Sequence, residues 1–168
     1  MSSPRFRTAA VLAAVMIALP LAGCAGNRSR SKADTSYVAR DVATLYNAAK
    51  SRLDRGQYKL AAALFDEVER QHPYSVWARR AQLMSAYSYY LARDYTESTS
   101  SAQRFLSIHP GNRDAPYAYY LIALNYYEQI SDVTRDQKIT QQAVDAFGEL
   151  TRRYPQSRYA ADARWTNG

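Results

Sequence analysis

A repeated break in helical sequence constrains the fold of this chain more than any other feature. Pro73, Pro110 and Pro155 each follow a stretch whose apolar residues recur at helical spacing, and they lie 37 and 45 residues apart. A proline ends a helix because it lacks the backbone N–H and its ring clashes with the preceding turn. A period of this length indicates stacked supersecondary units rather than one irregular domain.

Each interval divides into two predicted helices joined by a turn. The predicted helices span about 42–55 and 59–71, 76–92 and 95–108, and 115–130 and 137–153. Gly56 follows the first helix and can take the left-handed conformation that ends a helix. The second of the two proline intervals, which contains the third hairpin, is longer than the first. We assign its extra residues to the loop at Ser131–Asp136.

Small and bulky residues recur in the same phase in all three units. The small residues are Ala49, Ala86 and Ala123 in the first helices and Ala61, Ser98 and Ala143 in the second; the bulkier positions that follow hold Phe65, Ala102 and Phe147, then Val68, Phe105 and Leu150. This pattern resembles the tetratricopeptide family. The resemblance implies an all-α fold, a right-handed superhelical stack of about three helical hairpins plus the start of a fourth. The repeats are expected at about 42–73, 76–110, 115–155 and, in part, 158–168.

The first 24 residues predict export and lipid attachment. Arg5 and Arg7 precede an apolar run over residues 8–19, which is typical of a signal peptide and too short to span a bilayer comfortably. Leu-Ala-Gly-Cys at residues 21–24 resembles the bacterial lipobox, in which the cysteine is diacylated before cleavage. Cys24 is the sole cysteine and stands where this chemistry requires it. An ordinary signal peptide with a chance cysteine is the alternative.

These features predict three segments. Residues 1–23 form a lipoprotein signal peptide, residues 24–36 form the lipidated Cys24 with a flexible tether, and residues 37–168 form the repeat domain. Two or more acyl chains anchor a protein stably in a membrane. Ala25 follows the cysteine where inner-membrane lipoproteins of enteric bacteria carry Asp, so the resemblance implies anchoring in the outer membrane, facing the periplasm.

Composition and motifs argue against several function classes. The net charge is +7, but the basic residues alternate with acidic ones along the predicted helices, so nucleic acid is not an expected partner. One cysteine allows no multi-cysteine metal site. His72 and His109 each precede a proline at a helix end, without a nucleophile at motif spacing, and no glycine-rich phosphate loop is present. We therefore expect no catalytic residue, metal or cofactor, and no enzyme.

Function is then expected on the concave face, lined mostly by the first helix of each hairpin. The side chains expected there are Tyr46, Lys50, Leu53, Arg80, Leu83, Tyr87, Tyr90, Tyr117, Tyr120, Leu124 and Tyr127. The tyrosines could stack on and hydrogen-bond to an extended peptide, and Lys50 and Arg80 could pair with a terminal carboxylate. The alternative is that many tyrosines pack between repeats, with Tyr89, Tyr119 and Tyr126 the foremost candidates.

The lipobox, the short tether and repeats that end in Tyr/His-Pro-x-Ser together resemble the BamD family, lipoproteins of the outer-membrane β-barrel assembly machinery. The resemblance covers residues 37–164 and is closest at residues 154–163, 64–74 and 87–90. It implies binding of unfolded outer-membrane proteins and of partner subunits, for assembly and insertion. Family members normally carry further repeats, so a chain ending at Gly168 is expected to be shortened. The alternative is a periplasmic tetratricopeptide adaptor lipoprotein of cell-wall, Tol-Pal or pilus-secretin type.

Overall fold

The computed structural model describes residues 30–131 and 136–166. The signal peptide and Cys24 lie outside these residues, as does most of the loop expected at 131–136. The chain divides into two units, Met1–Arg40 and Asp41–Gly168, and the second unit is described here by itself. The helices are α2 (Arg30–Asp54), α3 (Tyr58–Gln71), α4 (Val76–Leu91), α5 (Tyr95–Ile108), α6 (Ala115–Tyr127), α7 (Gln137–Arg153) and α8 (Arg158–Thr166).

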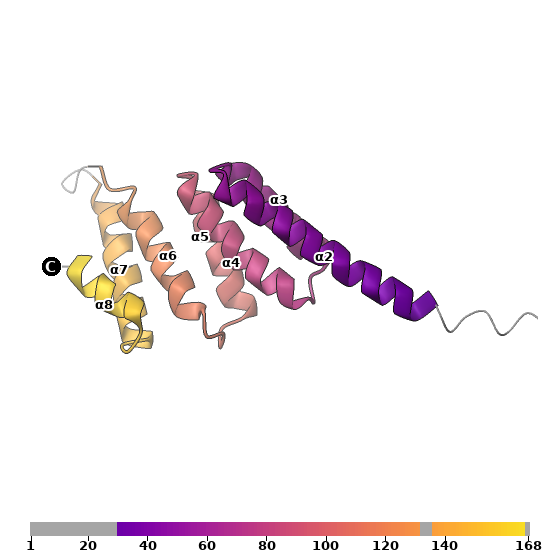
Figure 1. Ribbon diagram of the computed structural model, residues 1–168. Coiled ribbons are helices and arrows are strands. Elements are labelled where there is room, and N and C mark those ends of the chain that lie inside the picture. The colour runs from indigo at the N-terminus through magenta and orange to yellow at the C-terminus, as the bar shows by residue number, and fades with distance from the viewer. Residues whose placement is uncertain (1–29, 132–135, 167–168) are drawn as a thin grey trace, which may run out of the picture. The chain divides into compact units, whose positions relative to one another are not determined.

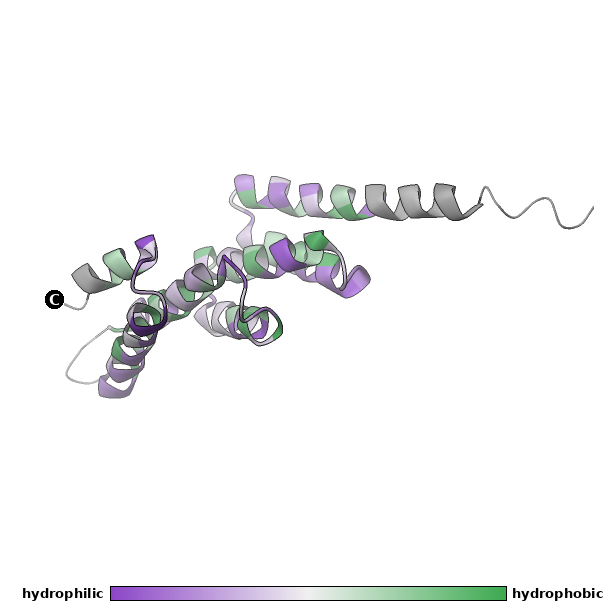
Figure 2. Ribbon diagram, turned by 90° about the horizontal axis from the view of Figure 1, so that it is seen from below, coloured by the Kyte–Doolittle hydropathy of each residue, from purple (hydrophilic) through white to green (hydrophobic). Residues whose placement is uncertain are grey.

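The predicted all-α stack of hairpins is confirmed. In the described residues every regular element is a helix, and α2–α3, α4–α5 and α6–α7 form consecutive hairpins, with α8 beginning a fourth (Figure 1). Hydrophobic and hydrophilic residues alternate along the coloured parts of the helices (Figure 2). None of the described helices is both long and apolar enough to cross a membrane.

Two predicted boundaries were wrong. Residues 30–36, which we assigned to a flexible tether, are the first turns of α2. Neither glycine nor proline stands between Arg30 and Asp54, so nothing in the backbone interrupts the helix before Val42. The other correction is at α6, which ends at Tyr127 instead of continuing to residue 130.

The three proline turns have the same hydrogen bonds. The residue before each proline caps the preceding helix, and the backbone N–H groups of His72, His109 and Tyr154 donate to the carbonyls of Val68, Phe105 and Leu150 at 3.1, 2.8 and 2.9 Å. The residue two after each proline closes the turn. The N–H groups of Ser75, Asn112 and Ser157 donate to the carbonyls of His72, His109 and Tyr154 at 3.0, 3.1 and 3.0 Å. The repeat of the prolines is therefore a repeat of one turn.

The serine of the Pro-x-Ser motif starts the next helix. The Ser75 hydroxyl accepts from the Ala78 N–H at 3.0 Å, and the Ser157 hydroxyl accepts from the Ala160 N–H at 3.1 Å. Asn112 takes this position in the second turn, where its side-chain oxygen accepts from the Asp114 N–H at 2.8 Å. Side chains of this type satisfy the free N–H groups of a helix start. The motif thus ends one hairpin and begins the next.

The core consists of three apolar clusters, each shared by adjacent hairpins. The first surrounds Phe65 and joins α2, α3 and α4; the second surrounds Phe105 and joins α4, α5 and α6; the third surrounds Phe147 and joins α6, α7 and α8. The predicted repeat positions are buried, and Ala49, Ala61, Ala86, Ser98 and Ala123 are 0% exposed. Small side chains there let the helix backbones approach closely, which confirms the phase of the repeat.

Polar contacts fix how α3, α4 and α5 pack. Asp66 of α3 accepts from the Ser85 hydroxyl at 2.6 Å and from the Tyr89 hydroxyl at 3.0 Å, both on α4. Arg104 of α5 lies 3.7 Å from Asp66 and 2.9 Å from Glu69. Because a half-buried carboxylate needs hydrogen-bond partners, this network favours one packing of the two hairpins.

A buried contact ties α4, α5 and α6 together in the same way. The Ser98 hydroxyl donates to the Ala86 carbonyl at 2.8 Å and accepts from the Asn125 amide at 2.9 Å. The same amide donates to Thr99 at 3.0 Å. A serine therefore replaces alanine at this small-residue position without leaving its hydroxyl unpaired.

The turns at the opposite ends of the first two hairpins require a left-handed residue. Gly56 has φ 73° and Arg93, 37 residues later, has φ 59°. The N–H groups of Gly56 and Arg93 donate to Leu53 and Tyr90, and the following residues donate to Arg52 and Tyr89, all at 2.9 Å. This conformation suits glycine and is unfavourable by about 1–2 kcal/mol for a residue with a Cβ.

We therefore expect opposite effects from exchanging these residues. Arg93→Gly should raise the free energy of unfolding by up to about 1 kcal/mol, and Gly56→Arg should lower it by about 1–2 kcal/mol. A Cβ at Gly56 would meet no atom closer than 3.9 Å, so the second effect would come from the backbone alone. Urea denaturation followed by circular dichroism measures both. Equal stabilities for the two variants and the unchanged chain would contradict the assignment.

Candidate functional site

A groove of about 1230 Å³ crosses the middle of the second unit. Its lining extends from Tyr46 on α2 to Arg158 and Tyr159 on α8, and includes the face of α4 from Arg79 to Tyr87. The end of α5 and the turn from His109 to Asp114 form one side of it. Side chains from all three hairpins and the partial fourth therefore meet at this groove.

Five of the eleven residues predicted for the peptide-binding face line this groove. They are Tyr46, Arg80, Leu83, Tyr87 and Tyr117. Four of the five lie on α4 or α6, the first helices of the second and third hairpins, and the fifth lies on α2. The first helices of all three hairpins therefore contribute to the lining of the groove.

The structure does not place the other predicted residues along the groove. Lys50 forms an ion pair with Asp54 at 3.0 Å, and the Tyr90 hydroxyl donates to Glu128 at 3.3 Å. Leu53 and Leu124 pack against the first and third clusters, and Tyr127 is 45% exposed with its ring 6.4 Å from Phe147. These side chains lie further along their helices than the groove extends.

Tyr120 is half-buried, packs against α8 and does not line the groove. Its ring stacks on that of Tyr159, with centroids 5.3 Å apart and planes 29° apart. Of the tyrosines proposed as packing residues, Tyr119 and Tyr126 are half-buried against the third and second clusters. Tyr89 is half-buried and hydrogen-bonded to Asp66. Some of the tyrosines thus line the groove and others pack against the core, and their binding of a peptide stays a prediction.

The groove opens where an aromatic triad is missing. In the first hairpin the Tyr46 ring lies 5.3 Å from Phe65 and 4.9 Å from Trp77. In the third, Tyr120 lies 6.3 Å from Phe147 and 5.3 Å from Tyr159 at the same three repeat positions. At the equivalent positions of the second repeat the residues are Leu83, Ala102 and Asp114. No ring fills the space there, and Leu83 and Asp114 line the groove instead.

Sequence reasoning missed the contribution of the turn after α5 and of α8. It did not select Arg79, Arg113, Arg158 or Tyr159, although all four line the groove. A signal for Tyr159 was present, because it occupies the repeat position of Trp77. The role of residues 109–114 depends on how the turn lies against α4, which no local pattern reveals.

The groove carries more basic than acidic side chains. Arg79, Arg80, Arg113 and Arg158 line it, against one carboxylate, Asp114. Arg113 lies 3.8 Å from Asp114, and Arg158 donates to the Tyr159 hydroxyl at 2.5 Å. Among the described residues, the ion pairs include neither Arg79 nor Arg80.

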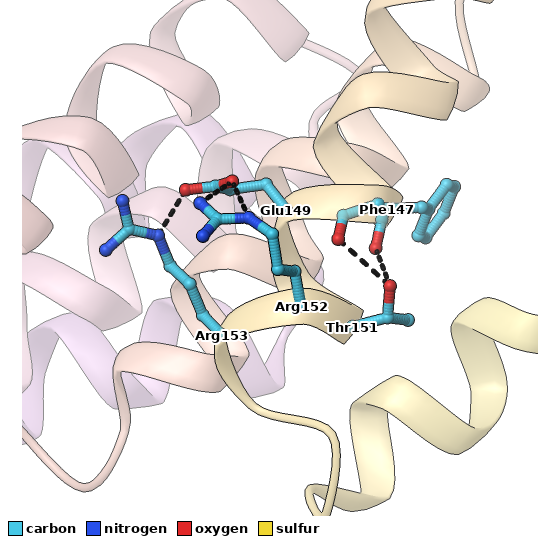
Figure 3. A network of polar contacts seen from close by, with 6 residues as sticks. Phe147, Glu149, Thr151, Arg152 and Arg153 are labelled. Carbon is cyan, nitrogen blue, oxygen red and sulfur yellow. Dashed lines mark hydrogen bonds and ion pairs between the residues drawn. The ribbon is translucent and has the colours of Figure 1, made fainter.

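Several basic residues outside the groove are paired with carboxylates. On α7, Arg152 and Arg153 both hydrogen-bond to Glu149 (Figure 3). Hydrogen bonds from Arg153 and Arg152 lower the pKa of the Glu149 carboxyl. Arg70 is bound to Glu67 in the same manner. Arg79 and Arg80 of the groove have no carboxylate partner among the described residues and are available for an acidic ligand.

The tyrosines of the groove are hydrogen-bond donors at neutral pH. Burial raises the pKa of Tyr46, against the opposing effects of Arg80 and Lys50. Burial also raises the pKa of Tyr117, whose ring lies 5.3 Å from that of Tyr159. Each therefore offers an apolar ring and a hydroxyl that donates, a combination common in protein interfaces.

These features define the class of the protein. It is a tetratricopeptide-like helical repeat protein with a basic, tyrosine-lined groove across its hairpins. Residues 38–166 match the YfiO family, described as outer membrane lipoproteins, and the chain belongs to this family.

Relatives of known name support this assignment. The chain is 48% identical over 158 residues to "Outer membrane protein assembly factor BamD" of Caulobacter vibrioides, covering 94% of this chain and 51% of the relative. The proteins of the same name from Rickettsia prowazekii and Neisseria gonorrhoeae are 40% and 32% identical, covering 90% and 91% of this chain and 58% and 61% of the relatives. The chain thus spans between half and two thirds of the length of these relatives.

His109 reports on the charge of the groove. Burial lowers the pKa of its imidazole below the usual 6.5, and the positive charge of Arg79 lowers it further, against an opposing effect of Glu69. The folded chain therefore takes up this proton at lower pH than the unfolded chain. Any stability linked to His109 is complete above pH 6.5 and is lost as the pH falls below it.

We expect Arg79→Gln to raise the pKa of His109 toward the usual value, because it removes one of the two causes. Titration of the two histidine side chains by NMR measures this. Arg70→Gln removes a charge from a guanidinium held by Glu67 outside the groove and should leave His109 unchanged. Equal shifts in the two variants would mean that Arg79 does not act on His109 locally.

Proposed function

We propose that this chain is a lipid-anchored assembly factor of the outer membrane, whose groove binds extended segments of unfolded outer-membrane proteins. The observation that carries the proposal is the groove itself, which is lined from four successive repeats and has unpaired arginines beside tyrosine rings. The family assignment and the name of the relatives support the same function.

The chemistry of the groove suits a particular kind of segment. Tyr87 and Tyr117 offer ring faces for aromatic or branched side chains, and Arg79 and Arg80 can bind a carboxylate, including that of a chain terminus. Segments of β-barrel proteins that end in an aromatic residue combine both features. An extended peptide also fits a long groove better than a folded domain does.

Cys24 is the proposed site of lipid attachment. The lipobox at residues 21–24 supports it, as does the membership of a family of outer membrane lipoproteins. The anchor would hold the repeats on the periplasmic side, where unfolded outer-membrane proteins arrive. Partner subunits of the barrel assembly machinery are proposed on the basis of the relatives' name, assembly factor.

The relatives also separate this proposal from the alternative. The three relatives named above are all assembly factors, and none carries the name of a cell-wall or secretin adaptor. For the same reason the proposed role is binding and assembly rather than catalysis. Within the described residues no group of three or more His, Cys, Asp or Glu side chains is placed to hold a metal ion.

Tyr87→Ala should weaken binding of a peptide from the C-terminal strand of an outer-membrane barrel protein by about tenfold, because a ring at the centre of the groove is lost. Tyr127→Ala is the matched control, since Tyr127 is exposed and lies outside the groove. Fluorescence anisotropy with a labelled peptide measures both affinities. Similar losses in the two variants would reject the groove in favour of a general role of tyrosine.

Arg80→Glu should weaken binding of the same peptide by about tenfold or more, because a charge-assisted contact becomes a repulsion. The effect should shrink when the peptide carries a C-terminal amide in place of the carboxylate. Lys138→Glu makes the same change of charge at the exposed start of α7, where an acidic residue is tolerated, and should leave binding unaltered. An equal effect for the acid and the amide would mean that Arg80 does not bind the terminus.

A further inference from the structure

Three large apolar side chains are exposed together at the proline-turn end of the hairpins. Tyr74, Val76 and Ile108 are 101%, 64% and 55% exposed, and all three line one cavity of about 420 Å³. Tyr74 lies in the turn between α3 and α4, Val76 is the first residue of α4, and Ile108 is the last residue of α5. We refer to these three residues as the turn-end patch.

The fold does not require these side chains to be apolar. The Ser75 hydroxyl caps α4, and the neighbouring Tyr74 ring is fully exposed. The buried residues that hold this turn in place are Val68 and Ala78, not the patch. Exposed apolar groups that gather in one place usually mark a surface that another molecule covers.

The chain enters the second unit at this same end. Asp41, the first residue of the unit, lies 3.7 Å from His72, which precedes the turn that carries Tyr74. Only 17 residues separate Asp41 from Cys24. Residues 30–40, being helical, span about 16 Å, and the six preceding residues reach at most about 20 Å. An anchor at Cys24 would therefore keep this end within about 36 Å of the bilayer.

The charge beside the patch favours an anionic surface. Arg79 lines both the small cavity and the groove, and no carboxylate pairs with it in the described part of the chain. Arg113, in the next proline turn, has a side chain that is 89% exposed. The nearest acidic side chain of the cavity, Glu69, is occupied by Arg104 at 2.9 Å. Arginine beside tyrosine and aliphatic residues is typical of protein surfaces at the membrane interface.

We propose that the turn-end patch rests on the anionic phospholipid surface of the membrane in which the chain is anchored. The proposal depends on lipidation of Cys24, which belongs to the proposed function. The new element is the orientation of the repeats relative to the membrane. Because Arg79, Ile108 and His109 line both the groove and the small cavity, the groove then opens next to the membrane. A short tether makes even a weak contact effective, since the patch is held at high local concentration.

The test uses the full chain with its anchor, reconstituted into vesicles of phosphatidylethanolamine and phosphatidylglycerol. Tyr74→Trp places a fluorophore in the patch, and Leu60→Trp places one at a comparable exposed position at the start of α3, the other end of the hairpin. The unchanged chain provides the background of Trp77 and Trp165. Lipids brominated in their acyl chains quench only indoles that reach the bilayer.

We expect brominated lipid to quench the added emission of the Tyr74→Trp protein by about half or more, and that of the Leu60→Trp protein far less, because only the patch enters the interface. Quenching should weaken in vesicles of phosphatidylcholine alone, which lack the anionic charge. Equal quenching of the two proteins, or none, would overturn the proposal. Loss of peptide binding in Tyr74→Ser without any quenching in Tyr74→Trp would also overturn it, and would make the patch part of the peptide site.

Two further measurements separate this inference from the proposed function. Mass spectrometry of the purified chain shows whether Cys24 is acylated, so failure of the anchor is detected independently of the patch. Tyr87→Ala, combined with Tyr74→Trp, should weaken peptide binding by about tenfold and retain the quenching. Loss of quenching in that combination would mean that the indole reports on the groove and not on the membrane, and would count against the patch.

Discussion

No hairpin of this chain can bury its apolar face alone, and this constraint organises the whole structure. Phe65, Phe105 and Phe147 are 0–1% exposed, and each is enclosed by its own hairpin together with the next helix along the chain. The helices approach closely because Ala86 and Ser98, like their equivalents, present almost no side chain. The proline turns follow from the same need, since each must return the chain at an angle that starts the next hairpin.

The groove lies where the repeat departs from itself. Aromatic rings fill the space beside Tyr46 and Tyr120, and the second hairpin has Leu83 and Asp114 at the corresponding positions. The resulting groove brings together residues that are distant in sequence, from α2 to α8. A strictly regular array would have closed it with a third set of rings. The irregular hairpin is therefore the one at which the proposed binding groove lies.

The distribution of charge follows the same division between packing and binding. Arginines on the outer surfaces of α3, α5 and α7 pair with carboxylates one turn away or on the adjacent hairpin, as Arg104 does with Glu69. Arg79 and Arg80 face the groove without such partners among the described residues. The tyrosine rings exclude water from the groove, and this strengthens the attraction of the two arginines for a carboxylate. Selectivity would then come from a few unpaired charges and not from the net charge of the chain.

The sequence by itself determined the helices, the turns and the register of the stack, because these depend on local patterns of proline, capping residues and alanine that recur every hairpin. It also indicated five of the groove residues, since the phase of the first helices follows from that register. Only the tertiary structure decided which tyrosines remain open. Tyr87 and Tyr120 both lie on the first helix of a hairpin, yet Tyr87 lines the groove and Tyr120 stacks on Tyr159 of α8. Such a difference depends on which helix packs beside a side chain. Residues far along the chain determine that packing.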